Sequence, residues 1–159
     1  MSRNLTYCAV DFDGTMVVHD FPRIGANIGA GPVLRHLVNN CKVKVILNTV
    51  RDIHYLDDAV QWCKDNGIDL FGVNENPDQK AFSESKKVHA DCFIDDLSLG
   101  CPLHDGYVDW YEVLNILMDT FANVEQNTPN DKYDELIKEI LNEQNKVTSN
   151  ILQDYGYTM

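Results

Sequence analysis

The sequence predicts an open α/β sheet of five mainly parallel strands. The first observation is that short apolar runs alternate along the chain with segments whose apolar residues recur at helical spacing. The second is that acidic and hydroxyl side chains directly follow several of these runs. Because ligands of open α/β sheets bind outside the carboxyl ends of the strands, this pattern indicates one functional site at that edge.

The predicted strands are brief apolar segments that end in polar or turn-forming residues: 5–10, 43–47, 70–73, 91–94 and 107–108. The predicted helices begin at residues that favour a helix start and carry an apolar stripe: 31–38, 53–66, 109–121 and 131–151. Asn66 and Gly67 suit a left-handed cap at the end of the second helix. Residues 16–30 are rich in turn-forming residues and are expected to form an irregular flap.

The composition changes after residue 122, which divides the chain into a predicted catalytic core, residues 1–122, and a tail, residues 123–159. The tail begins with a polar stretch, residues 123–130, that is expected to be a linker. An amphipathic helix is expected from Asp131 onward, within an acidic segment. Its apolar stripe favours packing on the chain's own core, and self-association into a homo-oligomer is the alternative.

The bulk composition narrows the possible partners. A formal net charge of -12 argues against a basic groove for nucleic acid, so a small phosphorylated substrate is expected, with a nucleic-acid end as the less favoured partner. The five cysteines are scattered without a CxxC pair, which supports neither zinc ligation nor a disulfide framework. No apolar run is long enough for a membrane helix, so no membrane partner and a cytoplasmic location are expected.

The segment Asp11-Phe12-Asp13-Gly14-Thr15 carries the most specific chemistry. A carboxylate that leaves a strand can attack phosphorus in line, which makes Asp11 the candidate nucleophile of an aspartyl-phosphate mechanism. Asp13 can protonate the leaving alkoxide and later deprotonate the hydrolytic water. Gly14 permits a tight turn and the Thr15 hydroxyl can hold the loop. Phe12, Gly14 and Thr15 are expected to bind the substrate.

Two further strand ends supply candidate partners. At the end of the second strand the Thr49 hydroxyl can bind a phosphoryl oxygen, and Arg51 can either bind substrate phosphate or orient the loop. Asp95 and Asp96 follow the fourth strand, where adjacent carboxylates are costly unless they bind a cation. Mg²⁺ prefers oxygen ligands and suits Asp11, the Asp13 carbonyl and Asp95, with Asp96 completing the metal site through a water or from behind the direct ligands.

The site also requires a positive side chain, because many carboxylates would surround a dianionic substrate. Lys86 and Lys87 lie just before the fourth strand, and one of them is expected to pair with Asp11 and the transferred phosphoryl group. In the flap, Arg23 and His19 are candidates for substrate contact.

These residues resemble the motifs of the haloacid dehalogenase (HAD) superfamily over roughly residues 5–118. The first motif is the Asp11–Thr15 segment, the second is Thr49, the third is best matched by Lys87, and the fourth is the acidic pair after Phe93-Ile94. The likeness is greatest to small bacterial and phage hydrolases that share Phe-Pro-Arg-Ile-Gly after the first motif and Ala-Asp-x-Phe-Ile-Asp-Asp at the fourth.

The resemblance implies a HAD-type Rossmann-like fold, which is a three-layer sandwich, together with Mg²⁺ and phosphomonoester hydrolysis through an aspartyl-phosphate. An Asp at position 13 is typical of the phosphatases and phosphomutases of that superfamily rather than of its dehalogenases. The intervals between Asp11, Thr49 and Lys87 are too short for a large cap domain, so the site is expected to be open.

Two alternatives compete with this interpretation. A receiver domain also combines an acidic cluster with Thr and Lys, but its phosphorylated Asp ends the third strand, where residues 70–74 contain none. The other alternative is a catalytically idle binding or scaffold protein that keeps the HAD fold.

Overall fold

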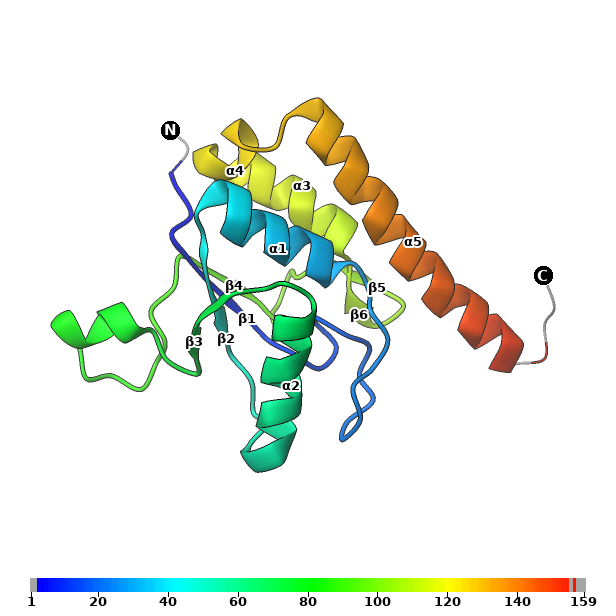
Figure 1. Ribbon diagram of the computed structural model, residues 1–159, viewed down its shortest axis with the longest axis horizontal. Helices are drawn as coiled ribbons and strands as arrows, with labels where there is room; N and C mark the ends of the chain where they lie inside the picture. The colour runs from blue at the N-terminus through cyan, green and yellow to red at the C-terminus, as the bar shows by residue number, and fades with distance from the viewer. Residues whose placement is uncertain (1–2, 155, 157–159) are drawn as a thin grey trace.

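Four short parallel strands form the central sheet, in the order β3-β2-β1-β4 (Figure 1). The computed structural model describes residues 3–154 and 156. The strands are β1 (Tyr7–Val10), β2 (Lys44–Leu47), β3 (Leu70–Val73) and β4 (Cys92–Ile94). Each lies within a predicted strand, and β1 pairs in parallel with both β2 and β4. The predicted α/β architecture with a parallel sheet is therefore confirmed.

The prediction of a fifth strand in this sheet is wrong. Tyr107–Val108 forms β6, which pairs antiparallel with β5 (Leu103–His104) in a separate hairpin. Asp105 and Gly106 join the two strands with φ angles of 51° and 84°. Positive φ at both turn residues matches the twist of a two-residue hairpin, so this dipeptide directs the chain back on itself. The Val108 amide also donates to the Gly14 carbonyl, which ties the hairpin to the loop after β1.

All five α-helices contribute to one hydrophobic core on a single face of the sheet. They are α1 (Ala30–Cys41), α2 (Ile53–Asp65), α3 (Trp110–Thr120), α4 (Ala122–Gln126) and α5 (Asn130–Asp154). Because side chains alternate along a strand, Cys8 and Val10 of β1 face this core while Tyr7 and Ala9 face the other side.

The opposite face of the sheet carries much less structure than a three-layer sandwich would place there. A small cluster of buried residues, Ala9, Ile46 and Val88, lies on it. The segment between β3 and β4 supplies Val88 and contains only the 3₁₀-helix η1 (Pro77–Ala81). Asn76 caps η1 by accepting a hydrogen bond from the Asp78 amide. This segment has proline and polar residues in place of an apolar helical stripe, so the predicted third layer is a short, mostly irregular cover.

The tail packs on the rest of the chain. Residues 123–126, the first half of the predicted linker, belong to α4. The Asn123 side chain anchors this helix through hydrogen bonds to the Leu5 amide and carbonyl and to the Cys41 carbonyl. Helix α5 contacts α1 and α3, and it lies along their outer side in Figure 1. Its stripe residues Leu136 and Ile140 are buried in the common core. Packing on the chain's own core, the favoured interpretation of this stripe, is confirmed, and self-association stays a prediction.

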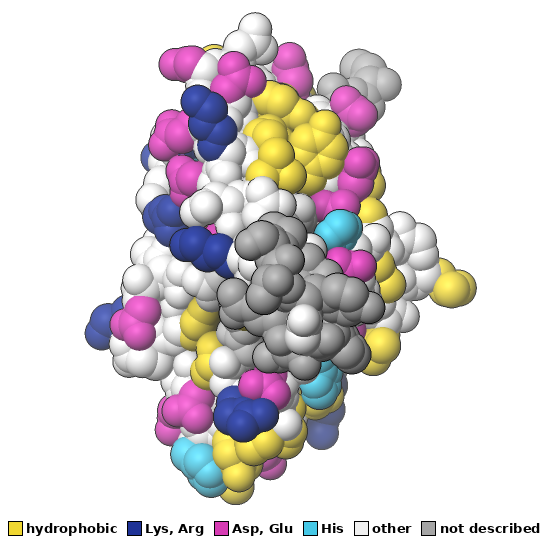
Figure 2. Space-filling model, turned by 90° about the vertical axis from the view of Figure 1, so that its right-hand side faces the viewer, with side chains coloured by type: hydrophobic (Ala, Val, Ile, Leu, Met, Phe, Trp, Pro, Cys, Tyr) yellow, Lys and Arg dark blue, Asp and Glu magenta, His cyan; other side chains and the backbone are white. Residues whose placement is uncertain are grey.

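The surface carries charges of both signs. On the face shown in Figure 2, Lys and Arg side chains are interspersed with acidic, polar and apolar ones. Within the described part of the chain, no helix combines the length and apolar content that crossing a bilayer requires.

Candidate active site

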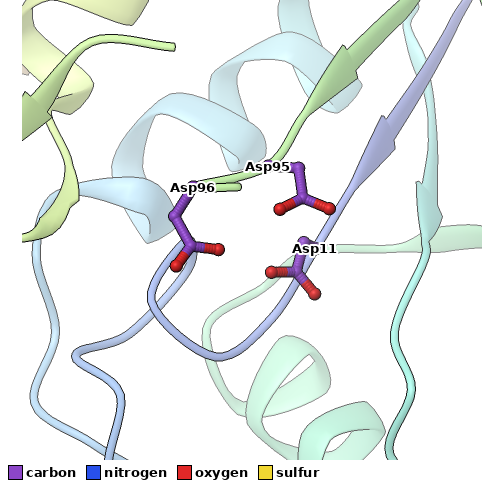
Figure 3. A group of neighbouring side chains, drawn as sticks. All are labelled: Asp11, Asp95 and Asp96. Carbon is purple, nitrogen blue, oxygen red and sulfur yellow. The ribbon is translucent and has the colours of Figure 1, made fainter. Parts of the chain in front are cut away.

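Three carboxylates meet at the carboxyl edge of the sheet (Figure 3). Asp11 follows β1, and Asp95 and Asp96 follow β4. Val10 lies beside Ile94 in the register of these two strands, and the Asp11 amide continues the pairing by donating to the Ile94 carbonyl at 2.9 Å. One oxygen from each of the three carboxylates lies within 4.8 Å of the others, and all three residues are half-buried. Parallel pairing of β1 with β4 thus brings together residues that are far apart in the sequence.

The loop after β1 is held by Thr15 and Gly14. The buried Thr15 hydroxyl donates to Asp11 Oδ2 at 3.1 Å and accepts from the Asp96 amide at 3.1 Å, so one side chain links two of the carboxylate residues. Gly14 has a φ of +79°, and a Cβ there would lie 2.5 Å from Asp96 Oδ2. Trp110 Nε1 donates to the Thr15 carbonyl at 2.7 Å. Both predicted loop residues therefore position the carboxylates.

The electrostatics of the cluster favour a cation. The pKa of the Asp11 carboxyl is raised to about 7, chiefly by burial, and the nearby Asp95 charge contributes to this rise. Hydrogen bonds from the Phe12 amide and from Thr15 oppose it. A bound divalent cation would stabilise the ionised form of all three carboxylates. The donor set contains only oxygen atoms, which suits a hard ion such as Mg²⁺ or Ca²⁺. These residues therefore fit a metal site.

Asp13 lies apart from this cluster because Arg51 holds its side chain. Arg51 Nε and Nη2 donate to the two carboxylate oxygens at 2.7 and 2.8 Å, and the Arg51 side chain is 1% exposed. Its other N–H groups donate to the carbonyls of Pro22, Arg23 and Tyr55. All five donors of the guanidinium are thus used. Of the two roles predicted for Arg51, the structure favours orientation of the loop, and in this arrangement no donor is left for substrate phosphate.

The aromatic residues around Arg51 complete this support. The guanidinium carbon lies 5.0 Å from the centroid of the Phe12 ring and 5.1 Å from that of Phe21. Phe12 is fully buried and packs edge-to-face on Trp62. The Phe12 side chain is therefore part of the core, so any substrate contact at this position must come from the backbone.

A cavity of about 390 Å³ opens beside the carboxylates. The residues that line it include most of the predicted acidic site together with apolar neighbours: Asp11, Asp13, His19, Phe21, Val50, Arg51, Asp95, Asp96 and Leu97. His19, a flap candidate, is among them. Arg23 is not, because its exposed side chain pairs with Asp20 at 3.0 Å.

Comparison with solved structures gives a relative of this chain. A conserved protein coded by a locus of Bacteroides thetaiotaomicron has a TM-score of 0.59 and 33% sequence identity, over 73% of this chain and 91% of that one. The chain belongs to the same family as that conserved protein. No family model matches the chain, and no curated protein matches it. Membership of the HAD superfamily accordingly stays a prediction.

The structure does not bring every predicted residue to the cavity. Thr49 lies at the end of β2, where its amide donates to Asn74 Oδ1 at 2.7 Å and its hydroxyl accepts from the Arg51 amide at 3.1 Å. It supports Arg51 but does not line the cavity.

Lys87 borders a different hollow, together with Phe82, His89 and Phe93, and Lys86 borders a third. The buried Gln79 side chain accounts for this placement. It donates to the carbonyls of Ser85 and Lys87 and accepts from the His89 amide, which holds this segment against η1. In this arrangement neither lysine completes the predicted site.

Sequence reasoning missed the apolar residues of the cavity, Phe21, Val50 and Leu97. A signal for two of them was present, because Val50 directly follows Thr49 and Leu97 directly follows Asp96. An apolar residue at such a position lies beyond the end of the buried strand, so it is left at the edge of the sheet where the site forms. Phe21 lies in the flap, whose path could not be read from its composition.

Proposed function

We propose that the chain is a Mg²⁺-dependent phosphohydrolase of HAD type that cleaves phosphomonoesters through an aspartyl-phosphate on Asp11. The observation that carries the proposal is the convergence of Asp11, Asp95 and Asp96 within 4.8 Å, with Asp13 lining the same cavity. Among the described residues, this is the only group of three or more potential metal ligands that meet in this way.

The carboxylates divide into two functional groups under this proposal. Asp11, Asp95 and Asp96 would hold the cation together with the Asp13 carbonyl, and the cation would neutralise charge on the substrate phosphate. An oxygen of Asp11 attacks phosphorus, and the bond from phosphorus to the ester oxygen breaks as the alcohol leaves. Water then attacks the aspartyl-phosphate, which releases inorganic phosphate and restores Asp11.

Asp13 is the proposed general acid and base, and Arg51 is its positioning residue. The bidentate pair fixes the carboxylate at the wall of the cavity, two residues after the nucleophile. Each Asp13 oxygen retains a lone pair beside its hydrogen bond to Arg51, so it can accept a proton from water while held. Delivery of a proton to the leaving alkoxide requires the carboxyl to be protonated and to turn one oxygen from Arg51 into the cavity.

A second candidate function is a binding protein that keeps the fold without turnover. The observation in its favour is the position of Lys87 and Lys86, which border other hollows and leave the cavity without a free cationic side chain among its lining residues. A hydrolase would then depend on the metal alone to balance the charge of the phosphate.

Hydrolysis of an aryl phosphate with and without Mg²⁺ tests the proposal. We expect turnover by the wild type, none after removal of the metal, and none from Asp11→Asn. Asp58→Asn is the matched control, because Asp58 is an exposed carboxylate on α2 outside the cavity. Acid quenching followed by mass spectrometry should find the added phosphoryl group on Asp11. A wild type as inert as Asp11→Asn on a broad panel of phosphate esters would favour the binding protein.

A further inference from the structure

The outer wall of the cavity is apolar and faces water. Phe21, Val50 and Leu97 have exposed fractions of 48%, 100% and 88%. They come from three separate segments, namely the flap and the loops after β2 and β4, and they line one cavity with the carboxylates. Apolar groups gathered beside a polar centre are typical of a ligand site, in which they regain burial when the ligand binds.

Phe21 is held in position before any ligand arrives. Its ring packs edge-to-face on Tyr55 with centroids 5.3 Å apart, and the Arg51 guanidinium lies 5.1 Å from its centroid. Arg51 is itself fixed by hydrogen bonds to Asp13 and to three backbone carbonyls, so the Phe21 ring packs against a side chain that has little freedom to move. A preorganised apolar wall loses little conformational entropy when a ligand packs on it.

The charges of the cavity discriminate against a second phosphate. Its ionisable lining residues are four aspartates, His19 and Arg51, and all five donors of Arg51 are occupied within the protein. A cation at Asp11, Asp95 and Asp96 serves the phosphate that reacts. Apart from His19, the groups that another phosphate on the same substrate would meet are an apolar wall and carboxylates, both of which disfavour it.

We infer that the substrate is a small monophosphate ester of a neutral alcohol with an aromatic or otherwise apolar body. This inference rests on the proposed function and specifies its substrate class. The phosphate meets the carboxylate side of the cavity, and the apolar body packs against Phe21, Val50 and Leu97. A cavity of about 390 Å³ accommodates a small ligand of this kind. Bisphosphates, nucleoside diphosphates and oligonucleotide ends are disfavoured.

The test compares esters with similar alkoxide leaving groups, so that intrinsic reactivity does not decide the result. With Mg²⁺ present, kcat/KM for 2-phenylethyl phosphate should exceed that for ethyl phosphate by roughly 10- to 100-fold, the effect of burying one phenyl group. Ethylene glycol bisphosphate should be the poorest substrate of the three. Leu97→Ser should reduce the ratio of phenylethyl to ethyl ester several-fold. Leu97→Lys should raise kcat/KM for the bisphosphate relative to ethyl phosphate.

Leu99→Ser is the matched control, since Leu99 is fully exposed two residues further on and does not line this cavity. The control should keep the wild-type ratio. Activity on all esters with a ratio near one, or a preference for the bisphosphate, would overturn the inference and leave the proposed function standing. A lack of turnover on these three esters by a chain that hydrolyses other phosphate esters would also overturn the inference alone. Inertness equal to that of Asp11→Asn on the broad panel of esters as well would overturn the proposed function, and the inference with it.

Discussion

Replacement of Arg51 by Met should destabilise the fold more than any change to an exposed charge. Methionine keeps a long apolar stem between Phe12 and Phe21 but removes the guanidinium. The half-buried Asp13 carboxylate then loses both of its charge-assisted hydrogen bonds, at 2.7 and 2.8 Å. Three backbone carbonyls, those of Pro22, Arg23 and Tyr55, lose a donor at the same time.

The magnitude follows from the burial of the pair. The side chains of Arg51 and Asp13 are 1% and 13% exposed, and breaking a buried pair by removing one partner costs about 3–5 kcal/mol. This is a large share of the roughly 5–15 kcal/mol by which domains are stable. In a chain of this size each kcal/mol lowers Tm by about 2–4 °C, so the expected decrease is roughly 6–20 °C.

Thermal unfolding followed by circular dichroism measures the change. Arg23→Met is the matched control, because Arg23 pairs with Asp20 on the surface and its side chain is 80% exposed. It should leave Tm almost unchanged, since exposed pairs contribute little. The double variant Arg51→Met with Asp13→Asn should recover part of the loss, because no unpaired charge remains. A Tm of Arg51→Met equal to that of Arg23→Met would refute the structural role assigned to the pair.

Three further predictions concern the loop, the metal and pH. Gly14→Ala should lower stability by about 1–3 kcal/mol in urea titrations and should weaken metal binding, because a Cβ meets Asp96; Gly106→Ala, also at positive φ but with nothing within 4 Å, shows the backbone strain alone. Mg²⁺ at about 100 times its Kd should stabilise the fold by about 2.7 kcal/mol in a thermal shift assay. Asp95→Asn should lose that metal-dependent shift. Without metal this variant should be more stable than the wild type, because the Asp95 charge repels the Asp11 carboxylate and so raises the pKa of Asp11. Burial, assisted by the Lys132 charge, lowers the pKa of His36 from its ordinary value of 6.5, so the unfolded chain binds the proton more readily and stability is lost as pH falls from 6.5 through the folded pKa. Urea midpoints at pH 5 and pH 7 should therefore differ less in His36→Gln than in the wild type, and equal differences would contradict this assignment.

The parts of the fold that depend on local pattern could be predicted from the sequence. The apolar residues of β1 stop just before Asp11, and those of β4 stop just before Asp95. These changes from apolar to acidic residues mark the ends of the two strands in the sequence. Parallel pairing then places both strand ends at one edge, so the acidic cluster of Asp11, Asp95 and Asp96 could be predicted from the sequence. The Asp105-Gly106 dipeptide is a local signal for a two-residue hairpin. The strand after it was nevertheless assigned to the central sheet, whereas it pairs with β5.

The partners of Arg51 and Lys87 could not be predicted in the same way. Arg51 and Asp13 lie 38 positions apart, and their pairing depends on how the flap folds over α2 to present the Pro22 and Arg23 carbonyls. Lys87 lies at the position expected for the third motif, but the Gln79 side chain holds its segment against η1. The three hydrogen bonds of Gln79 have no sequence signature. The partners of Arg51 and the position of Lys87 both depend on hydrogen bonds between residues that are distant in the sequence or that no motif marks.

The clasp between Asn123 and Leu5 bears on the order in which the chain matures on the ribosome. The two residues are 118 positions apart, and β4, the second neighbour of β1 in the sheet, is also made late. At about 5–20 residues per second, β1 waits roughly 6–24 s for the Asn123 side chain that closes its amino-terminal end. Until β4 has been synthesised, the apolar residues of β1 have only β2 as a neighbouring strand, which leaves one edge of β1 unpaired in the nascent chain.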